Sequence, residues 1–136
     1  MTKMTWSGNT ITSPNWAGDF LDPDHLVSGS QVDPAGFTAD AQGRKPILSG
    51  TMVGRTYAEQ VAGTAYGPLD PTGGDEDFYL TAFDVTDAAD LPDVELYRHG
   101  SIVKEDLLPE WGNAAIWTAT AIAQLRANYA TIQSAA

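Results

Sequence analysis

The chain has 136 residues, of which 43% are hydrophobic and none is cysteine. This length supports one buried core rather than two, and the lack of cysteine excludes disulfide scaffolds, thiolate nucleophiles and cysteine-based zinc sites. The formal net charge is -11, from 18 acidic and 7 basic residues, and the basic residues form no patch, so neither nucleic acid nor an anionic membrane surface is expected as a partner.

No apolar run approaches the roughly 20 residues that span a bilayer, and residues 1–9 lack the apolar centre of a signal peptide. We therefore expect a protein that is made in the cytoplasm. A strongly acidic chain is also expected to be highly soluble at high local copy number.

The first 21 residues are rich in Thr, Ser, Asn and Gly but carry large apolar side chains at wide intervals. A disordered tail should be poor in aromatic residues, whereas a segment that orders on a partner needs a few large anchors in a polar, extended backbone. We therefore predict a partner-binding arm over residues 1–21, and the alternative is a strand packed on its own domain. The candidate binding residues of the arm are Thr5, Trp6, Ile11, Trp16 and Phe20.

Three segments follow that are rich in turn-forming residues. Residues 22–43 hold short apolar pieces between prolines and glycines, which is typical of short strands separated by turns. Residues 45–57 are β-like, with Pro46 at an edge and glycines at bends or bulges, and predict part of a curved sheet. Residues 58–77 are rich in Gly, Pro and acidic side chains, so we expect a surface loop there.

The strongest strand pattern covers residues 78–85. Both its odd-numbered and its even-numbered positions are mostly apolar, so both faces of this strand should be covered. Residues 94–97 and 101–104 flank Arg98-His99-Gly100, in which the glycine can supply the positive φ of a three-residue hairpin loop. We therefore predict a β-hairpin at this place.

The last segment is helical in pattern. Asn113 follows Pro109 and Gly112 and can cap a helix over residues 114–130, with apolar residues at three- and four-residue spacings. The elements together predict a β-rich α+β fold: a small β-barrel or curved-sheet domain with an extended N-terminal arm and a C-terminal helix. A single domain would comprise residues 22–136.

The two histidines are weak candidates for chemistry. His25 closes a turn-forming Asp-Pro-Asp-His sequence, which offers too few ligands for a closed metal site. His99 stands near Ser101, Asp93 and Asp106, the residue types of a hydrolase triad. No Gly-x-Ser-x-Gly elbow is present, however, and a hairpin tip would surround His99 with water. We predict neither a catalytic nor a metal site.

The acidic stretch 70–77 could gather oxygen ligands for calcium, but it lacks the ordered spacing of a twelve-residue calcium loop. No phosphate-cradling or dinucleotide-binding glycine motif follows a strand. Carboxylate pairs can be chosen from 18 acidic residues in many ways, so their presence does not point to glycoside hydrolysis. We expect a solvated acidic loop and no cofactor.

Two blocks carry a resemblance to a known family. Residues 79–87 read Tyr-Leu-Thr-Ala-Phe-Asp-Val-Thr-Asp, and residues 94–110 read Val-Glu-Leu-Tyr-Arg-His-Gly-Ser-Ile-Val-Lys-Glu-Asp-Leu-Leu-Pro-Glu. These blocks contain four parts in a fixed order. First comes an apolar strand that ends in a turn with Ala and Asp, and then a strand with an aromatic residue before a basic residue and glycine. A return strand follows, and after it Glu-Asp, two apolar residues and Pro-Glu. From Gly43 to Trp111 the chain resembles the lambda-type phage head decoration proteins.

The resemblance implies a binding protein rather than an enzyme. It would bind the major capsid protein on the outer surface of the expanded virion head, form a homotrimer and clip neighbouring capsid subunits together. In that family a mobile N-terminal arm adds to a β-sheet of the shell, so the arm over residues 1–21 would be the capsid-binding element. Trp111 and Trp117 are expected in the core or at the subunit interface.

Two other classes of function stay open. One is a carbohydrate-binding module that uses exposed Trp6, Trp16, Trp111 or Trp117 as stacking platforms. The other is a small hydrolase or lyase with an acidic pair in a β-barrel.

Overall fold

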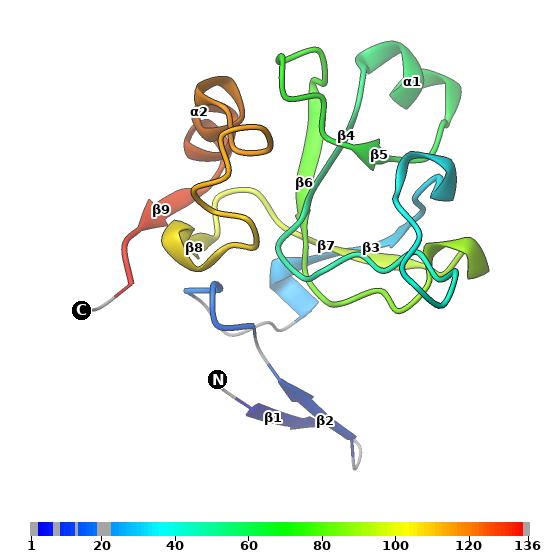
Figure 1. The fold of residues 1–136 in the computed structure, drawn as a ribbon. Helices are drawn as coiled ribbons and strands as arrows, with labels where there is room; N and C mark the ends of the chain where they lie inside the picture. Colours follow the sequence, from blue (N-terminus) through cyan, green and yellow to red (C-terminus); the bar gives the residue numbers. More distant parts are fainter. Residues whose placement is uncertain (1–2, 7–8, 13, 19–22, 135–136) are drawn as a thin grey trace.

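The computed structural model describes residues 3–6, 9–12, 14–18 and 23–134. Its centre is an antiparallel sheet in the order β3-β7-β6-β4-β5 (Figure 1). The predicted β-rich α+β class is confirmed. Within the described ranges the sheet does not close on itself, so the barrel alternative is wrong and the fold is consistent with the alternative of a curved sheet. The strands are β3 (Leu26–Ser30), β4 (Met52–Arg55), β5 (Gly67–Pro68), β6 (Asp77–Thr81) and β7 (Val94–Tyr97).

Both faces of the sheet are covered, as the pattern of residues 78–85 predicts. Alternate strand residues point to opposite faces, so Leu80 and Tyr97 enter one core cluster while Leu96 and Val53 enter the other. The first cluster comprises Trp16, Met52, Phe78, Leu80, Ala82, Tyr97, Val103, Leu108, Trp117, Ala121, Leu125 and Tyr129. The second comprises Val32, Ile47, Val53, Tyr66, Ala88, Val94 and Leu96.

Short 3-10 helices connect the strands. Asp33 caps one of them by accepting a hydrogen bond from the Ala35 N–H at 2.9 Å, so residues 23–43 do alternate short elements with turns. These helices are η1 (Pro23–His25), η2 (Pro34–Gly36), η3 (Ala88–Asp90) and η4 (Glu105–Leu107).

The predicted hairpin over residues 94–104 is wrong. β7 pairs with β3 and β6, whereas β8 (Ile102–Lys104) pairs in parallel with β9 (Ala130–Ile132). Gly100 has the predicted positive φ, at 87°, but its N–H donates to the Asn128 carbonyl and not across a hairpin. The glycine therefore turns the chain out of the main sheet, and β8 lies beside β9 and α2 (Ala119–Asn128) (Figure 1).

The C-terminal helix is shorter than predicted and has a different cap. Thr118 caps α2 by accepting a hydrogen bond from the Ala121 N–H at 3.1 Å. Asn113 caps a separate turn instead, because its Oδ1 accepts from the Ala115 N–H at 3.0 Å. The buried Trp117 fixes this turn, since its Nε1 donates to the Pro109 carbonyl at 2.9 Å. Residues 114–118 are therefore outside the helix, and residues 130–132 form a strand.

Residues 58–77 are more structured than a surface loop. α1 (Tyr57–Ala62) and β5 lie in this segment, and Tyr66 is buried in the second core cluster. Asp77 holds the segment to β4, because its Oδ2 accepts hydrogen bonds from the Arg55 Nε at 2.6 Å and from the Tyr66 hydroxyl at 2.8 Å. Composition excluded a long helix here but not a short, well-capped one.

A buried carboxylate holds the C-terminal strand in place. Glu105 accepts hydrogen bonds from the Arg126 Nε at 3.0 Å and Nη2 at 2.7 Å, and from the Gln133 Nε2 at 2.7 Å. The Arg126 guanidinium lowers the pKa of the Glu105 carboxyl below its usual value. Glu105 therefore joins η4, α2 and the end of β9.

Replacing Glu105 with glutamine is expected to lower the free energy of unfolding by about 1–2 kcal/mol at neutral pH, because its charge-assisted hydrogen bonds to Arg126 are lost. The loss stays moderate because the Arg126 side chain is half-exposed, so that water screens part of the attraction between the two charges. The lowered pKa makes the stabilisation fully present above about 4.5 and lost as the pH falls through the native value. Urea denaturation at neutral and acid pH measures both effects. Glu76→Gln, which removes an exposed charge, is the control, and an equal loss in both variants would contradict the prediction.

Candidate binding surfaces

The N-terminal residues form a β-hairpin rather than a single extended arm. β1 (Lys3–Trp6) pairs antiparallel with β2 (Asn9–Thr12), and Figure 1 shows the pair beyond the lower edge of the domain. Directly opposed residues of an antiparallel pair share a face. The register therefore groups positions 4, 6, 9 and 11 on one face, which in the sequence are Met, Trp, Asn and Ile.

The opposite face of this hairpin holds positions 3, 5, 10 and 12, which are Lys and three Thr. The hairpin is thus amphipathic in sequence, and Lys3 is the only charged residue among the first 18 residues of a chain with a net charge of -11. A two-stranded hairpin on its own is marginally stable in water. It gains stability when a partner covers its apolar face.

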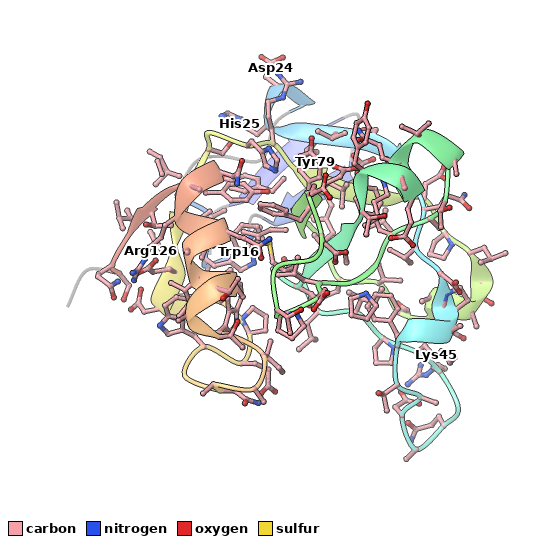
Figure 2. All side chains as sticks on the ribbon, turned by 90° about the horizontal axis from the view of Figure 1, so that it is seen from above. Trp16, Asp24, His25, Lys45, Tyr79 and Arg126 are labelled. Carbon is pink, nitrogen blue, oxygen red and sulfur yellow. The ribbon has the colours of Figure 1, made fainter. Side chains whose placement is uncertain are left out.

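The predicted arm does not form one unit over its described residues, and the expectation for Trp16 is wrong. Trp16 is 2% exposed and its ring meets the Tyr97 ring edge-on at 5.1 Å. Figure 2 shows it between α2 and the sheet. The segment is fixed further by an antiparallel bridge between Ala17 and Val103. Of the other candidate arm residues, Thr5, Trp6 and Ile11 lie on the hairpin, and Phe20 lies outside the described residues.

Two adjoining hollows form an apolar groove on the body of the domain. One has a volume of about 520 Å³ and the other about 510 Å³, and Leu48 and Pro109 line both. Leu48 is 57% exposed and Ile116, on the wall of the first hollow, is 49% exposed. We call this surface the Leu48 groove. Exposed apolar surface of this kind usually marks an interaction site.

The Leu48 groove is built by segments far apart in the sequence. Residues 36–38, 46–52, 68–71 and 109–117 line its first hollow, and residues 14–16 and 82–84 line the second hollow. The side chain of Trp117 is buried, and the Trp111 ring packs against it with the centroids 5.2 Å apart. The expectation of a core position therefore holds for Trp117. Burial also removes Trp16 and Trp117 as sugar-stacking platforms.

A second apolar surface lies on α1. Tyr57 is 63% exposed and Val61 is 70% exposed, and no residue of the helix is buried. Residues 57, 58, 61 and 62 fall on one side of the helix and are Tyr, Ala, Val and Ala. We call these four residues the α1 ridge.

His99 lies in an aromatic cluster and not at a solvated hairpin tip, so that expectation is wrong. Its ring stacks on Tyr79 with the centroids 4.1 Å apart and meets Tyr129 edge-on at 5.4 Å. Its Nε2 donates to the Phe78 carbonyl at 2.6 Å, which fixes the tautomer. The turn after β7 thus places His99 between β6, which holds Phe78 and Tyr79, and Tyr129 at the end of α2.

The residue types of a triad are not assembled around His99. Asp106 accepts hydrogen bonds from the backbone and side chain of Ser134, and Asp93 accepts one from the Gln31 side chain at 3.1 Å. Ser101 is buried beside β8. Each group is thus engaged with a different part of the chain.

The acidic stretch 70–77 is partly buried and not wholly solvated, which corrects the expectation. Asp75 packs against Gly54 and accepts a hydrogen bond from the Asp70 N–H at 2.8 Å, and burial raises the pKa of its carboxyl. Asp70 caps a turn through Thr72, whose hydroxyl lowers the pKa of Asp70. Asp77 belongs to the cluster with Arg55 and Tyr66. These carboxylates hold the segment against β4.

Neither a metal centre nor a membrane span is evident in the part of the chain that the structure describes. No group of three or more His, Asp or Glu side chains converges there. Over the same residues, no helix has both the length and the apolar character to cross a bilayer. Comparison of the chain with protein-family models, curated protein sequences and solved structures found no match.

Proposed function

We propose that this chain is a capsid decoration protein, which binds the outside of an expanded phage head and clips neighbouring capsid subunits together. The observation that carries the proposal is the N-terminal hairpin. It is amphipathic, it stands apart from the body of the domain, and it is nearly free of the negative charge that the rest of the chain carries. The resemblance of residues 43–111 to decoration proteins supports the same function.

The hairpin is suited to binding at a sheet edge of the shell. Among the described residues each of its two strands pairs on one side only, so the main-chain N–H and C=O groups of the other edge can pair with a neighbouring strand, while the apolar face fills pockets. A trimer would present three such hairpins, and the second and third attachments become intramolecular once the first has formed. Weak single contacts thus give a long-lived attachment.

The proposed mechanism is binding without covalent chemistry. A protein that binds only the expanded lattice stabilises that lattice by the free energy of binding. The acidic body, which carries all 18 carboxylates, would face outward and disfavour contact between particles. The proposed partners are therefore the major capsid protein and further copies of this chain.

Deleting residues 2–12 is expected to abolish binding to expanded shells without unfolding the domain. The boundary matters because deletion through residue 20 would also remove the buried Trp16. Cosedimentation with shells measures attachment, and circular dichroism with urea denaturation shows whether the body remains folded. Undiminished attachment of a folded deletion variant would rule out the hairpin mechanism.

Point variants separate the two faces of the hairpin. Trp6→Ser changes the face that holds positions 4, 6 and 11, and Thr10→Ala changes the opposite face. We expect Trp6→Ser to weaken cosedimentation at least tenfold, because a buried aromatic anchor typically contributes more than about 1.4 kcal/mol to binding. Thr10→Ala should bind as the unaltered chain does. Equal binding by both variants would contradict an apolar docking face.

A further inference from the structure

α1 owes its stability to its caps and not to packing. Thr56 accepts a hydrogen bond from the Glu59 N–H at 3.1 Å, and the Glu59 carboxylate accepts one from the Thr56 N–H at 2.9 Å. Gly63 ends the helix in the left-handed region with φ 75°. Six residues with no buried side chain can be helical on this basis. Against the described residues, therefore, the apolar side chains of the α1 ridge are left exposed.

The α1 ridge and the Leu48 groove are both exposed and apolar. The ridge is a helix face on which Tyr57 and Val61 are exposed, and the groove is a hollow in whose lining Leu48 and Ile116 are exposed. No residue of the ridge lines either hollow of the groove, so one chain does not pair its own ridge with its own groove. A second copy can supply the missing half of each contact.

The α1 ridge and the Leu48 groove carry few acidic residues for so acidic a chain. The chain carries 18 acidic residues, but the only acidic residue of α1 is Glu59, and among the described residues the only acidic ones that line the groove are Asp84 and Glu110. Glu59 points back to its cap. Asp84 accepts a hydrogen bond from the Ser49 N–H, and Glu110 accepts one from the Asn113 side chain. Two copies that meet here bring together carboxylates that each already accept a hydrogen bond, which limits the repulsion between two chains of net charge -11.

We propose that the α1 ridge of one copy docks into the Leu48 groove of the next copy. Such a contact joins two different surfaces, so successive copies associate head to tail and a ring forms when the rotation closes. This inference rests on the self-association part of the proposed function and names the surfaces through which it occurs. It does not require the hairpin or the shell.

The test uses two single variants of the full chain and their mixture. Val61→Glu places a charge on the ridge and leaves the groove intact, and Leu48→Asp does the reverse. Both positions are exposed, so both variants should fold, which circular dichroism checks. In analytical ultracentrifugation we expect a finite oligomer for the unaltered chain and a monomer for each variant. The mixture should give a one-to-one dimer and nothing larger, because only one ridge and one groove remain functional.

The control is Leu91→Asp, which places the same charge on a side chain that is 56% exposed and belongs to neither surface. It should assemble as the unaltered chain does. The proposal is overturned by a monomeric unaltered chain, by assembly of either single variant alone, by a mixture that stays monomeric, or by dissociation of the control. Shell binding is read separately by cosedimentation. Assembly without shell binding would therefore count against the decoration function alone, and shell binding by a monomer against this inference alone.

Discussion

Replacement of Trp16 by alanine is expected to lower the free energy of unfolding by about 3–5 kcal/mol, the usual cost of removing a buried large aromatic side chain. Trp16 packs against Tyr97, and its Nε1 donates to the Ser49 hydroxyl at 3.0 Å. That hydroxyl donates in turn to the Ala82 carbonyl at 2.7 Å. The substitution removes the contact that joins the N-terminal segment to the sheet and to the Leu48 groove. Urea denaturation followed by circular dichroism measures the loss.

The deletion of residues 2–12 is the matched control for Trp16→Ala. It removes the whole hairpin but leaves Trp16 in place, so we expect the free energy of unfolding to change by less than about 0.5 kcal/mol. The pair of measurements locates the boundary between hairpin and domain. A Trp16→Ala variant as stable as the unaltered chain would mean that Trp16 belongs to the binding segment after all.

The error at Trp16 has a physical cause. Wide spacing of Trp6, Ile11 and Trp16 in a polar segment indicates anchors, but the spacing does not say on which surface each anchor rests. The pocket that holds Trp16 is built by Ser49, Tyr97 and their neighbours, which are far away in sequence. The sequence therefore predicts that each of these side chains packs on some surface, but not whether that surface belongs to the same chain or to another protein.

Local turn chemistry was predicted better than strand pairing. Gly100 does adopt a positive φ, but the partner of β8 is β9. The paired residues Ile102 and Ala130 are 28 positions apart in the sequence. Likewise both Asn113 and Thr118 are good capping residues, and the burial of Trp117 decides which of them begins the helix. A turn depends on its own residues, whereas pairing and helix length depend on the finished core.

The α1 ridge could have been found from the sequence. Thr56 and Glu59 have the spacing of a capping box, and Gly63 stands where a helix commonly ends. The apolar residues between them then fall on one helical face. The Leu48 groove leaves no such signal, because its lining comes from several segments that are far apart in the sequence. The Glu105 pair with Arg126 is hidden for the same reason.

Replacement of Tyr129 by phenylalanine is expected to lower the free energy of unfolding by about 2–4 kcal/mol, although only one oxygen atom is lost. The Tyr129 hydroxyl accepts a hydrogen bond from the Leu80 N–H at 3.1 Å and donates one to the Tyr97 carbonyl at 2.6 Å. Leu80 and Tyr97 are directly opposed in β6 and β7. The hydroxyl thus bridges two buried main-chain groups, and each costs about 1–3 kcal/mol when left unpaired.

The control for this substitution is Tyr57→Phe, which removes the same oxygen from an exposed ring and should change stability by less than about 0.5 kcal/mol. The pH dependence tests whether the Tyr129 hydroxyl is buried and protonated in the folded chain. Burial raises the pKa of Tyr129 above the ordinary value of 10.0, so the unaltered chain loses stability as the pH rises past that value, because the unfolded state gives up its proton first. Tyr129→Phe lacks this loss, and the difference between the two chains should therefore shrink at alkaline pH. A difference that stays constant from neutral to alkaline pH would mean that the Tyr129 hydroxyl is not buried in the folded chain, which would contradict its bridging role.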